Sequence, residues 1–285
     1  MGSRVIKAAP LIAVVIAGTF ISFGCNCRPY ITNERLNKGL VVILPGIEGP
    51  SPLNMSIRKG LYDGGVPYAI SIYNWGGGML GFTYAFSEGQ CEKRADEIAW
   101  SIRRYRAKHP GCPVFVVGHS AGAGIAVLTA EHMQPAEPLT GVVALAPPLS
   151  PKYDVTRALS GSGNRLVCCS SANDEFLRSL IAVGRNIDGT RGATAGQDGF
   201  ELPSGAPVGR KEAFTHLRQI RWDSSMKQYG NIGGHFGWTS PSWVASTIAP
   251  ILTSWAGGAE YPITSASGEA AKTGSVVIVD SDTSS

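Results

Sequence analysis

Short apolar runs alternate with longer segments of helical pattern between residues 40 and 255. The runs carry Val, Ile and Leu at consecutive positions, which is typical of strands that are buried on both faces of a parallel sheet. They occupy residues 40–44, 68–73, 113–117, 142–146 and 165–170. A later segment at 214–222 alternates apolar and polar side chains and predicts one further strand.

Helical patterns fill the intervals between these strands. In the longest, residues 88–108, apolar side chains recur on one face at three- and four-residue steps. Further helices are expected at 54–64, 123–133, 176–183 and 241–255, whereas the glycine-rich residues 185–211 show no periodicity. Strands that alternate with helices predict an α/β fold, a doubly wound, mostly parallel sheet with helices on both faces.

The composition is that of a globular protein with one substantial core. The 285 residues are 44% hydrophobic and 16% charged, and the formal net charge is only +4. The positive charges are scattered apart from residues 103–108, which we interpret as the solvated face of a predicted helix, so no nucleic-acid partner is expected. Residues 31–256 are predicted to form one domain, and the Ser-, Gly- and Ala-rich residues 257–285 a disordered tail.

The first thirty residues carry a targeting pattern. Arg4 and Lys7 form a basic start, an apolar run covers residues 8–23, and Cys25 follows a small residue, which resembles a bacterial lipoprotein signal. Residues 1–30 are therefore predicted to be a signal peptide or an N-terminal membrane or lipid anchor. We expect an exported protein that is periplasmic, extracellular or membrane-anchored. The six cysteines permit disulfides, but their spacing does not determine any pairing.

The stretch Gly118-His119-Ser120-Ala121-Gly122 carries the clearest chemical signal. It fits G-x-S-x-G and lies between a predicted buried strand and an Ala-rich predicted helix, as a nucleophile elbow requires. Such a turn exposes a serine hydroxyl above the end of the sheet, and the two glycines leave room for it. The backbone N–H of Ala121 would lie at a helix N-terminus, where negative charge is stabilised. The alternative is an ordinary glycine-rich turn between a strand and a helix.

Over about residues 38–256 the chain resembles the α/β-hydrolase superfamily. The resemblance rests on the elbow motif, on Asp174 after a later strand and on His235 near the end, in the chain order Ser, Asp, His. It implies an α/β-hydrolase fold and acyl transfer by a Ser120–His235–Asp174 triad, with no cofactor and no metal ion. Residues 148–164 alone separate two predicted strands where the superfamily usually carries a cap, so no large cap domain is expected.

His235 has the position that suits a general base. It follows the last predicted strand in a glycine-flanked loop, which can carry the imidazole over the site. His119 lies inside the elbow, and its side chain is expected to point away from that of Ser120. The remaining histidines lie at predicted helix ends or in the last predicted strand: His109, His132 and His216.

Asp174 lies in a short loop after a predicted strand, where the superfamily places its acid. Glu175 is an adjacent substitute, and Asp188 and Asp198 are weaker candidates in the glycine-rich segment. Asp174 also suits a purely structural role, because Asp is a favoured N-cap residue and a helix follows.

By the resemblance, the backbone N–H groups of Ala121 and Ile47 form the oxyanion hole. The loop at 45–49 departs from the commoner form of the superfamily, so the identity of the second donor stays open. Glu48 would repel an oxyanion, and its carboxylate is therefore expected to turn outward or to be paired.

Residues 74–86 contain apolar side chains that could line an acyl-chain site or pack in the core under a loop: Trp75, Met79, Leu80 and Phe82. The predicted function is hydrolysis of a carboxylic ester, with an apolar small-molecule substrate and an acyl-enzyme intermediate, as in an esterase or lipase. A thioesterase or acyltransferase with the same triad is the nearest alternative. A catalytically inactive binding protein of the same fold is the alternative from another class.

Overall fold

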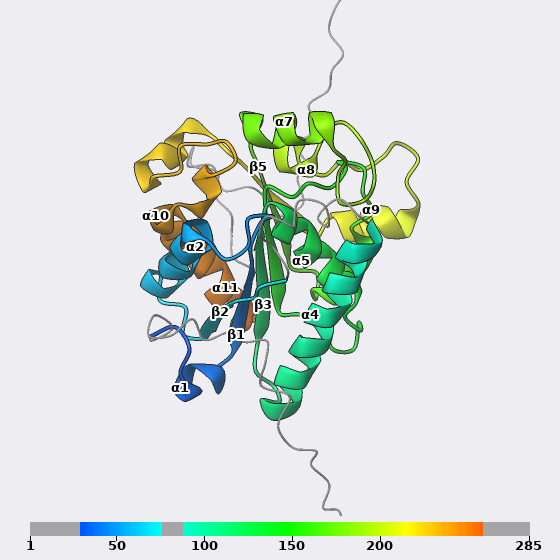
Figure 1. The fold of residues 1–285 in the computed structure, drawn as a ribbon. Helices are drawn as coiled ribbons and strands as arrows, with labels where there is room; N and C mark the ends of the chain where they lie inside the picture. The colour runs from blue at the N-terminus through cyan, green and yellow to red at the C-terminus, as the bar shows by residue number, and fades with distance from the viewer. Residues whose placement is uncertain (1–28, 76–87, 259–285) are drawn as a thin grey trace, which may run out of the picture.

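Six parallel strands form the centre of the molecule (Figure 1). The computed structural model describes residues 29–75 and 88–258. The strands are β1 (Leu40–Leu44), β2 (Ala69–Ile72), β3 (Val114–His119), β4 (Gly141–Leu145), β5 (Leu166–Ser170) and β6 (Leu217–Arg221). They lie in the order β2-β1-β3-β4-β5-β6 and every neighbouring pair is parallel, which confirms the predicted sheet.

Helices cover both faces of the sheet (Figure 1). One face carries α4 (Glu88–Lys108), α5 (Ala121–Glu131) and α6 (Thr156–Gly161), and the other carries α2 (Pro52–Asp63) and α11 (Ala249–Ala256). Successive side chains of a strand point to opposite faces, so Val42 packs with the first set of helices and Ile43 with the second. Both faces are buried, which explains why the strands are continuous apolar runs.

The strand order reverses between β1 and β3. After β1 the chain moves outward to β2, and it then returns to lay β3 along the other side of β1, with Leu44 opposite Gly118. The segments after β1 and β3 therefore leave the same edge of the sheet and continue into helices on opposite faces. In open α/β sheets this is the position at which ligands bind.

The glycine-rich residues 185–211 contain more helix than their composition predicts. They include α8 (Ala195–Asp198) and the start of α9 (Val208–Phe214). The prediction of a strand from residue 214 was wrong at its first residues, because Ala213 and Phe214 pack against the core from the end of α9 and β6 begins only at Leu217.

The remaining elements are short or match the expected pattern. They are α1 (Asn33–Leu36), α7 (Glu175–Val183), α10 (Pro241–Trp243) and the turns η1 (Ser224–Tyr229), η2 (Gly237–Thr239) and η3 (Val244–Ile248), the last of which is a π-helical turn. Between β4 and β5 the chain forms only α6 and short turns, so no large cap covers the sheet there. The adjacent Cys168 and Cys169 of β5 pack on opposite faces, as expected.

Two groups of predictions fall on residues whose structure is not described. Residues 1–28, with Cys25, and residues 259–285 lie outside the described part of the chain. Between residues 29 and 75 and between 88 and 258, no helix has both the length and the apolar character needed to cross a bilayer.

Candidate active site

Ser120 lies in the turn that joins β3 to α5. Its backbone has φ 56° and ψ −128°, a conformation that non-glycine residues rarely adopt and that costs about 1–3 kcal/mol. A Cβ on Gly118 would lie 2.6 Å from the Cα of Ala123, and one on Gly122 would lie 2.6 Å from the carbonyl carbon of Leu44. Both glycines are therefore required by close backbone contacts, and the turn has the geometry of a nucleophile elbow.

His235 and Asp174 are joined by a buried hydrogen bond. The Nδ1–H of His235 donates to Oδ2 of Asp174 over 2.7 Å. The exposed fraction is 0% for Asp174, 4% for His235 and 3% for Ser120. Because Nδ1 is engaged by the carboxylate, Nε2 is the ring nitrogen that remains for another partner, and the carboxylate stabilises the ring when that nitrogen is protonated.

Two loops hold this pair in place. The other carboxylate oxygen of Asp174 accepts a hydrogen bond of 2.7 Å from the Leu177 N–H, so Asp174 also caps α7. Gly233 and Gly234 have φ 84° and 66°, which lets the chain turn sharply before His235. The Gly234 N–H donates to the hydroxyl of Ser171 over 3.1 Å and so fixes the histidine loop to the loop after β5. Asp174 thus serves both as a helix cap and as the partner of His235.

The weaker acid candidates lie elsewhere. Glu175 is exposed on the first turn of α7 and pairs with Arg178 at 2.8 Å. The carboxylate of Asp188 accepts hydrogen bonds from the Ser150 N–H and from Thr190, and Asp198 is exposed in α8. Asp174 is the carboxylate that hydrogen-bonds to His235.

His119 has a contact that sequence reasoning missed. Its Nε2–H donates to the backbone carbonyl of His235 over 3.0 Å, and the centres of the two rings lie 4.9 Å apart. Burial, together with the nearby His235, lowers the pKa of His119 to about 3. His119 is therefore neutral at ordinary pH and acts as a fixed donor. The one sequence signal was its place in the elbow, where its side chain is expected to point away from that of Ser120.

The backbone N–H groups of Ile47 and Ala121 are the two donors that the sequence predicts for an oxyanion hole. Within the described part of the chain, neither N–H has a hydrogen-bond acceptor. A Cβ on Gly46 would lie 3.1 Å from the Cβ of Ser120, so the loop that carries Ile47 passes directly beside the elbow. The two donors expected from the sequence thus belong to segments that meet at Ser120.

Glu48 follows Ile47 and is exposed. Its carboxylate accepts hydrogen bonds from the hydroxyl of Ser51 at 3.2 Å and from the side-chain amide of Asn54 at 3.3 Å. The expectation that this carboxylate is turned outward or paired is met by the pairing. The carboxylate is not turned away from the elbow, because a Cβ on Gly46 would lie 3.2 Å from the Cδ of Glu48 and 3.1 Å from the Cβ of Ser120.

Trp75 supports the same loop. The residue is only 4% exposed, and its indole N–H donates to the carbonyl of Pro45 over 2.7 Å. This contact holds the segment that precedes Ile47. Met79, Leu80 and Phe82, which with Trp75 were expected either to line an acyl-chain site or to pack in the core, lie outside the described residues.

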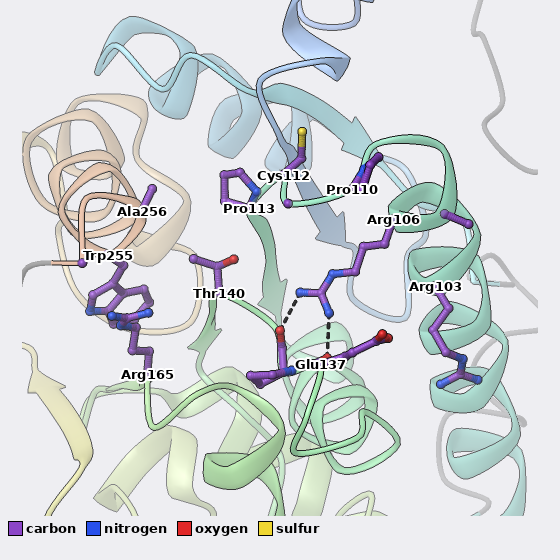
Figure 2. Close-up of a pocket in the computed structure, with 14 residues that line it drawn as sticks. Arg103, Arg106, Pro110, Cys112, Pro113, Glu137, Thr140, Arg165, Trp255 and Ala256 are labelled. Atoms are coloured by element: carbon purple, nitrogen blue, oxygen red, sulfur yellow. Dashed lines mark hydrogen bonds between the residues drawn. The ribbon is translucent and has the colours of Figure 1, made fainter.

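A cavity of about 660 Å³ opens at the opposite edge of the sheet, where β3, β4 and β5 begin (Figure 2). Arg103, Arg106 and Arg165 line it. The guanidinium of Arg106 donates to the carbonyls of Glu137 and Pro138 over 2.6 and 2.5 Å, as the dashed lines in Figure 2 show. This arginine fixes α4 to the segment that precedes β4, and the cavity is remote from Ser120.

The part of the chain that the structure describes contains no group of three or more His, Cys, Asp or Glu side chains that could hold a metal ion.

Comparison with known proteins gives a match at the elbow. A family model described as serine aminopeptidase, S33, matches residues 90–169, less than a third of the chain. The matched segment runs from α4 into β5 and includes Ser120, but neither Asp174 nor His235. No match was found among the curated proteins.

Solved structures of several hydrolases are similar at low sequence identity. A dienelactone hydrolase-like promiscuous phosphotriesterase from metagenomic libraries is 15% identical, with 76% of this chain and 86% of that chain covered and a TM-score of 0.44. A cutinase-like protein from Cryptococcus sp. is 13% identical, with 79% and 97% covered and a TM-score of 0.42. An esterase from Pyrococcus furiosus is 12% identical, with 77% and 84% covered and a TM-score of 0.45.

The class of the protein follows from its own fold together with the family match. A parallel sheet with this strand order and a serine in an elbow after β3 give the chain an α/β-hydrolase fold, and the matching family model covers the segment that carries this elbow. The family match, together with this fold, supports a hydrolase activity.

Proposed function

We propose that this protein is a serine hydrolase that cleaves carboxylic esters through an acyl-enzyme. Ser120 is the nucleophile, His235 the general base and Asp174 the acid that orients it. The observation that carries the proposal is the buried 2.7 Å bond from His235 Nδ1 to Asp174. It engages Nδ1 of the imidazole, so that in this proposal Nε2 is the nitrogen that takes the proton of the Ser120 hydroxyl.

In this mechanism His235 moves one proton in each half of the reaction. It takes the proton of Ser120 as Oγ bonds to the ester carbonyl carbon, and gives that proton to the leaving alcohol oxygen when the C–O bond breaks. Water then attacks the acyl-enzyme with His235 again as base, which releases the acid and restores Ser120. Asp174 stabilises the imidazolium that forms in both halves.

The backbone N–H groups of Ala121 and Ile47 stabilise the tetrahedral intermediates in this proposal. Support comes from the absence of any acceptor for either group among the described residues and from the short approach of Gly46 to Ser120. Each such donor contributes about 100- to 1,000-fold to kcat in enzymes of this chemistry.

Labelling with a fluorophosphonate tests the proposal, because this reagent forms a bond to an activated serine hydroxyl. We expect the folded protein to be labelled and the Ser120→Ala variant to remain unlabelled. Ser225→Ala, which removes a half-buried hydroxyl hydrogen-bonded to Asp223, serves as a matched control and keeps full labelling. Failure to label the folded protein contradicts the hydrolase proposal, and equal labelling of Ser120→Ala contradicts the choice of nucleophile.

Measurements of turnover then distinguish the proposed esterase activity from thioesterase and acyltransferase activities. We expect p-nitrophenyl esters to be hydrolysed with a higher kcat/KM than acyl-thioesters of the same acyl chain. A clear preference for thioesters indicates a thioesterase, and transfer to an added alcohol in place of water indicates an acyltransferase. If the protein is labelled by the fluorophosphonate but cleaves neither esters nor thioesters, the result favours a catalytically inactive binding protein of this fold.

A further inference from the structure

Exposed apolar side chains occur on the loop of His235 and on helix α7, and two of them, Phe176 and Phe236, contact each other. In the described part of the chain seven large hydrophobic side chains are exposed, and four of them belong to α7 or to residues 229–236. These four are Phe176, Tyr229, Ile232 and Phe236. Single exposed apolar residues are common on protein surfaces, but a local group of them indicates a binding surface.

Two members of this group contact His235 itself. The ring centres of Phe176 and Phe236 lie 4.8 and 5.2 Å from the centre of the imidazole, and 5.2 Å from each other. Phe176 is 43% exposed and Phe236 is 49% exposed. Each of the two residues therefore packs against the imidazole while the residue as a whole remains close to half exposed to solvent.

Both rings are carried by segments that the structure holds in place. Phe176 is the second residue of α7, whose first turn is capped by Asp174. Phe236 directly precedes η2, and its carbonyl accepts a hydrogen bond of 2.8 Å from the hydroxyl of Thr239. Apolar side chains on rigid elements bind a ligand without a large ordering cost.

The proposed reaction determines which part of a substrate meets these rings. The proton that His235 takes from Ser120 passes to the oxygen of the leaving alcohol when the C–O bond breaks. That oxygen must come within about 3 Å of Nε2, since proton transfer needs hydrogen-bond contact. The first carbons attached to it then lie within reach of the two phenyl rings, whereas the acyl chain begins at the carbonyl carbon.

We propose that Phe176 and Phe236 form the binding subsite for the alcohol part of the substrate, and that this part is apolar, either a benzyl-type group or an alkyl chain of several carbons. The inference rests on the proposed function, because it uses His235 as the group that protonates the leaving oxygen. It names the substrate class as esters of apolar alcohols. An aromatic alcohol adds ring contacts beyond those of simple burial.

Two ester series test the subsite in the full-length protein. The first varies the alcohol at fixed acetyl group: methyl, hexyl and benzyl acetate. The second varies the acyl group at fixed ethyl alcohol: ethyl acetate, butyrate and octanoate. We expect the double variant Phe176→Ala/Phe236→Ala to lose about tenfold in kcat/KM on benzyl and hexyl acetate, at most about twofold on methyl acetate, and equally little across the acyl series.

Two further variants keep the result interpretable. The single variants Phe236→Ala and Phe236→Leu are compared on hexyl acetate. Phe236→Leu retains an apolar side chain and should recover most of the activity that Phe236→Ala loses. Trp100→Ala, which removes an exposed aromatic residue from α4, should change neither series. An equal loss on every ester would mean that the rings only support His235, and a loss confined to the acyl series would assign them to the acid part; both results overturn the inference. A wild type that cleaves no ester in either series contradicts the proposed function itself.

Discussion

His119 and His235 connect the elbow to the histidine loop, because the Nε2–H of His119 donates to the carbonyl of His235 over 3.0 Å. His119 is the last residue of β3, and it pairs with Leu145 of β4, so its position is fixed by the sheet. The bond ties the backbone of the proposed base to the strand that carries the proposed nucleophile. A carbonyl acceptor requires a proton on Nε2, and the neutral ring then has its unprotonated Nδ1 buried without a partner.

Replacing His119 by Leu should lower kcat about tenfold with little change in KM. The variant removes the donor, leaves the buried carbonyl of His235 without a partner and loosens the loop, at a cost of about 1–3 kcal/mol in the free energy of unfolding. Steady-state kinetics and urea unfolding measure the two effects. His119→Gln, which retains a side-chain N–H, should recover most of the activity. Wild-type turnover in His119→Leu would show that the bond does not position His235.

Asp174→Asn should lower kcat by about 1,000- to 10,000-fold, because an amide favours the wrong tautomer of His235 and does not stabilise the imidazolium. Its stability should change little, since the oxygen of Asn can still accept the Leu177 N–H that Asp174 accepts now. Asp188→Asn and Asp198→Asn should stay within about twofold of the wild type. Kinetics of the three variants measure the ranking, and a larger loss in either control contradicts the choice of acid.

Local sequence patterns were sufficient to predict the strands of the sheet and the turn that carries Ser120. Continuous apolar runs predict the strands because both faces of the sheet are covered, and G-x-S-x-G predicts the turn because both glycines lie against backbone. A local pattern was also the source of the error at residue 214, where the predicted strand begins too early. The alternation of apolar and polar residues there begins in the last turn of α9, where Phe214 packs on the core from a helix.

Contacts between distant segments could not be predicted in this way. Periodicity reports that a side chain is buried, but not which group it meets. His119 and His235 are 116 positions apart, and Trp75 reaches the carbonyl of Pro45 from 30 positions away. The apolar character of Trp75 left acyl-chain lining and core packing equally open, and it gave no sign that the indole N–H donates to the carbonyl of Pro45 in the loop of Ile47. The aromatic neighbours of His235 were missed because Phe176 and Phe236 show no pattern in the sequence.

Gly122→Ala should destabilise the protein by about 2–3 kcal/mol or more, and should also lower activity. The added methyl group would overlap the carbonyl groups of Leu44 and Pro45, and backbone atoms at the end of β1 cannot move away easily. Gly209→Ala in α9 is the matched control, because a Cβ there meets no atom within 4 Å. It should be neutral or stabilise by up to about 1 kcal/mol. Urea denaturation compares the two variants, and equal stabilities would contradict the close contact at Gly122.

Glu131 at the end of α5 should make stability decrease as the pH rises. Burial raises the pKa of this carboxyl group from 4.5 to about 7, against smaller opposing effects of the Tyr153 hydrogen bond and of Arg157. Between pH 4.5 and pH 7 the folded state therefore holds a proton that the unfolded state has lost. The associated stabilisation is complete below pH 4.5 and disappears as the pH passes through 7.

Glu131→Gln keeps an acceptor for the Tyr153 hydroxyl, which donates to Glu131 over 3.0 Å, and removes the titration. Urea midpoints at pH 5, 6, 7 and 8 should be similar for the two proteins at pH 5 and higher for Glu131→Gln at pH 8, whereas Glu137→Gln, at an exposed position, should follow the wild type throughout. A wild-type curve that stays parallel to that of Glu131→Gln over this range would contradict the raised pKa.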